Sequence, residues 1–151
     1  MGSSAPVSAA VEREIVIAAC PETVWELLVD PEKATRWMGI EAWLDPRPGG
    51  LYRVRVTPRN TARGEFTVVE PPSRLVYTWG WESAEMLVPA GSSTVEIELV
   101  PEDGGTRVRL THRDLPAAAA EGHARGWDHY LPRLTDAAAG RDPGPDPWAA
   151  E

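Results

Sequence analysis

The sequence predicts an α+β fold in which a curved antiparallel sheet of about six or seven strands wraps round a long C-terminal helix. Three patterns predict it. Apolar and polar residues alternate through several short segments, two short helices follow the first segment, and after Asp114 apolar residues recur every three or four positions. The sheet has one apolar face, and only the final helix is long enough to cover it. The length of 151 residues suits one domain with one core.

The first strand is expected over residues 12–18, where side chains alternate in character. Two short helices follow this strand. Pro21 begins one helix as a first-turn proline, and Pro31 begins the other directly after Asp30, its expected N-cap. Residues 40–44 then form a strand that leads into the dense turn sequence DPRPGG.

The strand expected over residues 51–56 (LYRVRV) has two different faces. Its apolar side chains, which include Tyr52, point one way, and Arg53 and Arg55 point the other way, because side chains alternate across a strand. One face of the sheet is therefore expected to be covered and the other to be solvated.

The next two strands are expected to form a hairpin around a four-residue loop, residues 70–73. The pairs that follow are Val69–Arg74, Val68–Leu75, Phe66–Tyr77 and Gly64–Trp79. Trp81 lies one step further along the same face. A glycine opposite a tryptophan is expected to leave room above the sheet.

A second hairpin is expected around residues 101–104. Its apolar pairs are Leu99–Thr106, Ile97–Val108, Val95–Leu110 and Ser93–His112, and its charged pairs are Glu98–Arg107 and Glu96–Arg109. This register places apolar groups on one face and opposite charges on the other.

The final helix carries one apolar face. The residues at helical spacing on this face are Ala119, His123, Gly126, Trp127, Tyr130, Leu134 and Ala137. Pro132 lies inside the helix, so we expect a kink near His129 and not a break, because Leu134 resumes the pattern.

The two ends of the chain differ from its centre in composition. Residues 1–10 are small and polar, and residues 140–151 alternate Pro, Gly and Asp, so both are expected to be flexible tails that flank a single domain over residues 11–139. Trp148 is the exception, and it is a candidate for docking on the body or on a neighbouring molecule.

Charge and composition restrict the classes of partner. The net charge is −8 and no basic run occurs, which argues against nucleic acid and against an anionic membrane surface. There is no apolar run long enough to span a membrane, and residues 1–10 do not resemble a signal peptide. The single cysteine, Cys20, suits a reducing compartment, so the cytoplasm is expected.

Several motifs occur together in a familiar order: IAACPETVWELL over residues 17–28, DPRPGG before LYRVRV, EPPSRLVYTWGW, GGTRVRLTH and the late pair Gly126-Trp127. Together they resemble the homologues of the activator of heat-shock-protein-90 ATPase, a family of the START-like (SRPBCC, Bet v-like) helix-grip superfamily. The resemblance runs from about Glu12 to Ala138. It implies a helix-grip fold with an internal cavity between sheet and helix, and relatives include co-chaperone domains, polyketide cyclase-like proteins and carriers of hydrophobic ligands.

The candidate ligand-binding residues are mostly aromatic and are expected to line that cavity. They are Trp37, Met38, Trp43, Tyr52, Phe66, Tyr77, Trp79, Trp81, His112, His123, Trp127 and Tyr130. For each aromatic residue the alternative is an ordinary core position. His112 is the first choice for a polar anchor or a general base, with a hydrogen-bonded core-edge histidine as its alternative.

No catalytic, metal or cofactor site is predicted, because the sequence lacks metal-ligand spacing, a nucleophile with a base, and a phosphate-binding loop. The leading hypothesis is non-catalytic binding of a small, mainly hydrophobic molecule. The alternatives are a chaperone-regulating interaction module, with a possible homodimer contact, and a cyclase- or hydrolase-like enzyme that uses His112 or His123 as acid or base.

Overall fold

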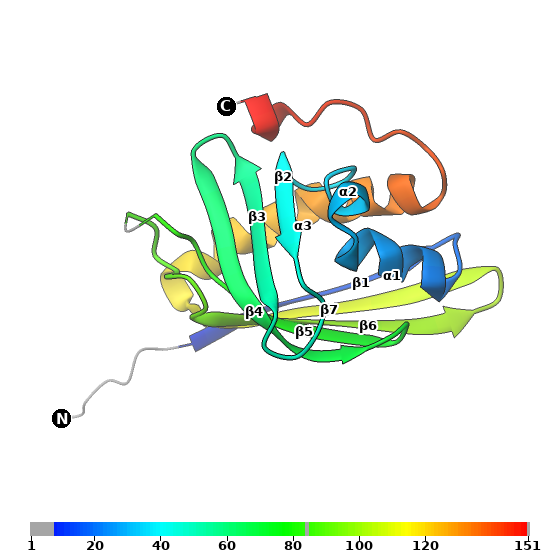
Figure 1. Cartoon of the computed structure of the whole chain (residues 1–151), viewed down its shortest axis with the longest axis horizontal. Coiled ribbons are helices and arrows are strands. Elements are labelled where there is room, and N and C mark those ends of the chain that lie inside the picture. The colour runs from blue at the N-terminus through cyan, green and yellow to red at the C-terminus, as the bar shows by residue number, and fades with distance from the viewer. Residues whose placement is uncertain (1–7, 84, 151) are drawn as a thin grey trace.

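Seven antiparallel strands form one curved sheet in the computed structural model, which describes residues 8–83 and 85–150 (Figure 1). Their order across the sheet is β1-β7-β6-β5-β4-β3-β2. The strands are β1 (Ser8–Ile17), β2 (Glu41–Leu44), β3 (Leu51–Thr57), β4 (Asn60–Glu70), β5 (Arg74–Trp79), β6 (Ser93–Glu102) and β7 (Gly105–Pro116). Every neighbouring pair except β1 and β7 is also consecutive in the chain.

The helices lie on the covered side of this sheet. They are α1 (Pro21–Val29), α2 (Pro31–Ala34), the long α3 (Ala117–Ala138) and a short 3-10 helix, η1 (Pro147–Ala150). The two short helices after the first strand and the long final helix match the predicted helix-grip α+β fold. Asp30 caps α2 as expected, because its carboxylate accepts the backbone N–H groups of Glu32 and Lys33. No helix in the described ranges combines the length and apolar character that a bilayer crossing requires.

Strand β1 begins earlier than the alternation of side chains indicates. Ser8 pairs with Pro116 and Ala9 with Leu115, so the backbone ladder with β7 extends β1 into residues that were expected to belong to the flexible tail. Residues 1–7 of that tail lie outside the described residues.

The β4–β5 hairpin closes around three residues, 71–73, and not around four. Glu70 pairs with Arg74, so the predicted pairs nearest the turn are wrong. An irregularity between Phe66 and Val68 shifts the register by one residue, which restores the predicted pairing of Phe66 with Tyr77.

Gly64 has a different role from the one predicted. It pairs with Tyr52 of β3, whereas Trp79 pairs with Ser93 of β6. A Cβ atom at Gly64 would lie 1.8 Å from the carbonyl oxygen of Thr78. The glycine therefore permits a close approach of two backbones, and it does not leave room beside Trp79.

The β6–β7 hairpin closes around the two residues Asp103 and Gly104. Gly104 has a φ of 75°, a conformation that glycine adopts readily in such turns. The tighter turn moves the pairing by two residues, so Glu98 faces Arg109 and Leu99 faces Val108. A shift of two keeps each side chain on its predicted face, but the predicted charged pairs are wrong.

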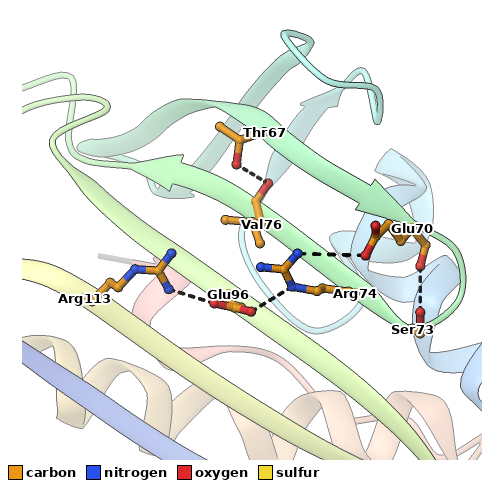
Figure 2. Close-up of polar contacts among 7 residues, drawn as sticks. All are labelled: Thr67, Glu70, Ser73, Arg74, Val76, Glu96 and Arg113. Carbon is orange, nitrogen blue, oxygen red and sulfur yellow. Dashed lines mark hydrogen bonds and ion pairs between the residues drawn. The ribbon is translucent and has the colours of Figure 1, made fainter.

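The outer face of the sheet carries a different set of ion pairs, shown in Figure 2. The carboxylate of Glu96 accepts from Arg74 Nε at 2.9 Å and from Arg113 Nη1 at 2.9 Å. These two arginines, the hydrogen bond from Arg74 first, hold the pKa of Glu96 below its ordinary value. The network keeps the outer face polar, while the apolar side chains gather on the covered face.

Helix α3 covers the apolar face and continues through Pro132 to Ala138, so the chain does not break at the proline. Its buried residues are Ala119, Trp127, Tyr130, Leu131, Leu134 and Ala138. On its other side Asp128 pairs with Arg13 of β1, with 2.7 Å between Oδ1 and Nε. The helix is therefore tied to an edge strand as well as to the core.

Candidate functional site

A cavity of about 500 Å³ lies along the first half of α3. Its walls come from α3, the α2–β2 connection, the ends of β3 and β5, the β5–β6 connection and η1. The lining residues are Met38, Val56, Thr57, Trp79, Trp81, Glu85, Met86, Leu87, Ala118, Ala119, Glu121, Gly122, His123, Arg125, Gly126, Trp127, Tyr130 and Trp148. A volume of this size suits a small organic molecule.

Two glycines of α3 help to explain why this space is open. Gly122 and Gly126 are one helical turn apart, so they lie on the same face of the helix. A Cβ atom at either position would meet nothing within 4 Å. Glycine inside a helix costs about 1 kcal/mol relative to alanine, and at these positions no close backbone contact requires it. The missing side chains leave volume that a larger residue would fill.

Tryptophan side chains form much of the wall. The rings of Trp79 and Trp81 meet edge to face with centroids 5.5 Å apart, and Trp79 lies 6.3 Å from Trp127. Trp79 Nε1 is buried and has no hydrogen-bond partner within the described residues. The surface that a bound molecule would meet is thus largely aromatic.

His112 lies behind this wall, fully buried on the covered face of β7. Its Nδ1 accepts from Trp127 Nε1 at 3.0 Å, and its Nε2 lies 2.8 Å from Ser93 Oγ. Ser93 Oγ in turn donates to the carbonyl oxygen of Trp79 at 2.7 Å. The chain of bonds joins α3 to β7, β6 and β5.

The hydrogen-bond geometry fixes the tautomer of His112. An indole nitrogen can only donate, so Nδ1 must be unprotonated and the proton must be on Nε2, which donates to Ser93. Burial, and to a smaller extent His123, lowers the pKa of His112 from 6.5 to about 3. Both ring nitrogens are bound to protein groups, and His112 does not line the cavity. The arrangement matches the hydrogen-bonded core histidine that was the alternative to an anchor.

His123 lines the cavity but is held in a similar way. Its Nδ1 lies 2.9 Å from the carbonyl oxygen of Ala119, and its Nε2 accepts from Trp81 Nε1 at 3.3 Å. The carbonyl can only accept, so the proton is on Nδ1. The rings of His112 and His123 are 5.3 Å apart, edge to face. Neither histidine has a free nitrogen for a proton transfer.

The structure brings six of the twelve predicted residues to the cavity: Met38, Trp79, Trp81, His123, Trp127 and Tyr130. Four others lie in the adjoining core, where Tyr52 stacks on Tyr77 at 4.1 Å, Phe66 meets both rings, and Trp37 donates to the carbonyl oxygen of Leu27.

Trp43 lies elsewhere, on the outer side of the sheet. It is 38% exposed, and the guanidinium of Arg53 covers its ring at 4.4 Å. It faces away from the cavity because Trp43 and Arg53 are paired on the side opposite to Tyr52.

Sequence reasoning missed Met86 and Leu87 of the β5–β6 connection, and Trp148, as parts of the wall. The connection has no periodic pattern, so nothing in the sequence places Met86 and Leu87 there. For Trp148 the only signal was a large aromatic residue in a segment otherwise rich in Pro, Gly and Asp. Gly126 was on the predicted helix face, but its role as an opening was not recognised.

The charged groups at the cavity are few. Arg125 Nη1 pairs with Glu121 Oε1 at 3.1 Å, one helical turn away, and Glu85 is the other lining carboxylate. Within residues 8–83 and 85–150 no three His, Cys, Asp or Glu side chains are placed to hold a metal ion.

Comparison with known proteins gives a family match over most of the chain. The family described as activator of Hsp90 ATPase homolog 1-like protein matches residues 18–139. A comparison with curated proteins finds no match.

Solved structures share the same architecture. The AHSA1-like protein from Rhizobium etli, solved by solution NMR, is 53% identical with a TM-score of 0.77, and the match covers 100% of this chain and 94% of that chain. CalU16 from Micromonospora echinospora is 29% identical with a TM-score of 0.64, over 84% of this chain and 73% of that one. The Aha1 dimer from Colwellia psychrerythraea is 17% identical with a TM-score of 0.74, over 86% and 96%, which shows a shared fold.

Proposed function

Since this chain belongs to the activator of Hsp90 ATPase homolog 1-like family, a START-like helix-grip family, we propose that it is a non-catalytic module that binds a small, mainly apolar molecule in the cavity beside α3. The observation that carries the proposal is an indole-lined cavity of about 500 Å³ whose helix wall contains two glycines with open space above them. Binding sites of this size and lining hold most of a ligand out of water.

The polar groups of the site support binding more than catalysis. His112 and His123 each use both ring nitrogens in bonds to the protein, so a cyclase- or hydrolase-like role would first require these bonds to break. A histidine that acted as acid or base would also need a free nitrogen facing the substrate.

The charges favour a ligand without an anionic head group. The described lining residues carry two carboxylates, Glu85 and Glu121, against one guanidinium, Arg125, which pairs with Glu121. A carboxylate or phosphate in the cavity would therefore lack an unpaired cation, and Glu85 would repel it. The proposal is for a neutral ligand with large apolar surface.

The test is a fluorescence titration with N-phenyl-1-naphthylamine, a neutral apolar probe, against the wild-type chain, Gly126→Leu and Gly126→Ala. We expect saturable binding by the wild type and a loss of at least about tenfold in affinity for Gly126→Leu, about 1.4 kcal/mol or more, because the new side chain occupies the cavity. Gly126→Ala adds one methyl group and should bind nearly as the wild type does.

Thermal unfolding provides the control for this titration. Both substitutions replace a helical glycine that has no close neighbour, so neither should lower the melting temperature, and Gly126→Ala should raise stability by about 1 kcal/mol. Absence of probe binding by the wild type, or equal binding by Gly126→Leu, would contradict the proposal.

A second candidate function rests on the family itself, whose description names an activator of the Hsp90 ATPase. Addition of the purified chain to a cognate Hsp90 should then change the ATPase rate, and Gly126→Leu should not abolish the change if the cavity has no part in it. The Colwellia relative is a dimer, so sedimentation velocity should accompany this assay. A cytoplasmic location agrees with the lone Cys20, which has no internal partner.

A further inference from the structure

The C-terminal segment returns to the cavity after α3 ends. In Figure 1 it leaves the far end of α3, arches back over the molecule, and finishes as the short helix η1 beside β3. Trp148 of η1 is a lining residue of the cavity. A side chain 10 residues beyond the end of α3 thus completes the site.

Trp148 packs against two residues of α3. Its ring stacks on His129 with centroids 3.8 Å apart and an interplanar angle of 14°, and it meets Tyr130 edge to face at 5.7 Å. Asp146 Oδ1 lies 2.8 Å from His129 Nε2 and accepts the Trp148 backbone N–H at 2.9 Å. The same carboxylate therefore holds both the helix and the indole.

Arg133 provides a second attachment. Its Nη2 donates to the carbonyl oxygen of Gly144 at 3.0 Å and its Nη1 to that of Pro143 at 3.4 Å, while its Nε donates to the carbonyl oxygen of Trp37. One side chain thus connects the segment to the body near α2.

These attachments all use side chains. Within the described part of the chain, no backbone-to-backbone hydrogen bond joins residues 142–150 to the rest of the molecule. Beneath the segment, Tyr130 Oη and Asp146 Oδ2 are buried, and neither has a hydrogen-bond partner of good geometry among the described residues. Together with burial, Asp146 raises the pKa of Tyr130. The docked segment can therefore detach without disrupting the sheet or α3.

We infer that residues 142–150 form a lid on the cavity, with Trp148 as a ligand-contacting wall and the contact between Asp146 and His129 as its latch. This inference rests on the proposed function. Detachment removes one wall and admits a ligand, and return of Trp148 buries apolar surface of the indole and the ligand together. The latch sets how often the lid opens.

The experiment combines equilibrium and stopped-flow binding of N-phenyl-1-naphthylamine by the full chain. Trp148→Ala should weaken affinity by about tenfold, because a wall is lost. Its matched control is Trp43→Ala, which removes an indole from the outer face and should leave affinity unchanged. Asp146→Ala should raise both the association and the dissociation rates by about three- to tenfold, because an opened lid no longer limits exchange.

Asp45→Ala is the matched control for the latch, since it removes a carboxylate that pairs with Arg47 in the β2–β3 connection and does not line the cavity. Its rates should equal those of the wild type. Trp148→Ala and Asp146→Ala should unfold within a few degrees of the wild type, because neither residue belongs to the sheet or to α3.

Two failures can be told apart. Wild-type binding that Trp148→Ala and Asp146→Ala leave unchanged overturns the lid and leaves the proposed function standing. No binding of the probe by the wild type overturns the proposed function, and the lid with it.

Discussion

His112 illustrates at the level of one residue how a buried polar group can connect secondary-structure elements. Each donor in this series of hydrogen bonds has one acceptor. The Trp127 indole N–H donates to Nδ1 of His112, Nε2 donates to Ser93 Oγ, and Ser93 Oγ donates to the carbonyl oxygen of Trp79. Because every group is satisfied, a neutral imidazole is tolerated in the core. A protonated imidazole would place two donors against each other at Nδ1.

A pH dependence of stability follows from this residue. Burial lowers the pKa of folded His112 from 6.5 to about 3, so between these values the unfolded chain takes up a proton that the folded chain does not. Stability should therefore fall as the pH drops below about 6.5, by up to about 1.4 kcal/mol per pH unit. Urea unfolding between pH 5 and 7 measures this slope, mostly above the range in which carboxylates titrate.

The comparison variants are His112→Gln and, should the first not fold, His112→Leu. Neither titrates at this position, so the slope should be shallower by the contribution of one histidine. Equal slopes in the wild type and the folded variant would show that His112 does not carry the effect.

At the level of secondary-structure elements, glycine has opposite roles in β4 and α3. Gly64 lies where a Cβ would collide with the backbone of β5, whereas Gly122 faces open space. Sequence alone does not separate these roles, because both glycines stand within otherwise regular elements.

Replacement by alanine should reveal the difference. Gly64→Ala must push β4 away from β5, since a backbone oxygen cannot move aside, and should lower the free energy of unfolding by roughly 2–4 kcal/mol. Gly122→Ala, the matched control, should be neutral or stabilising by up to about 1 kcal/mol. Chemical denaturation of both variants measures the two changes in the free energy of unfolding. A Gly64→Ala chain as stable as the wild type would contradict the close approach.

The ion-pair network in Figure 2 also connects secondary-structure elements, because it joins three neighbouring strands. Glu96 contacts two arginines and its side chain is 21% exposed, whereas Glu98 has no ion pair among those found in the described residues. Glu96→Gln should therefore cost about 0.5–1 kcal/mol, more at low salt than at high salt, and Glu98→Gln should cost less. If chemical denaturation gave the same loss of stability for both variants at both salt concentrations, that result would count against the network.

Much of each element was predictable, and the exceptions have local causes. Alternation assigned the faces of β6 and β7 correctly, because a two-residue change of register leaves every face unchanged. It did not show the tighter turn at Asp103-Gly104, which decides which charges meet. Alternation also did not show the irregularity beside Phe66, because no particular residue type marks the position of an extra residue in a strand.

At the scale of the whole molecule, the sequence predicted the helix-grip fold but only part of the candidate site. Trp79, Trp81 and Trp127 were predictable because each lies on a periodic apolar face. Trp43 follows the same alternation in a strand too short to establish which face is covered. Trp148 reaches the site through a segment without periodicity, so only tertiary structure could place it.

The position of β1 in the sheet has a consequence for synthesis. The first strand pairs only with the last, so its partner does not leave the ribosome until nearly all of the domain has been made. Helix α3 emerges later still, and until then the aromatic side of the nascent sheet has no cover. The nascent chain would therefore expose this apolar face for seconds, at roughly 5–20 residues added per second, until α3 emerges to cover it.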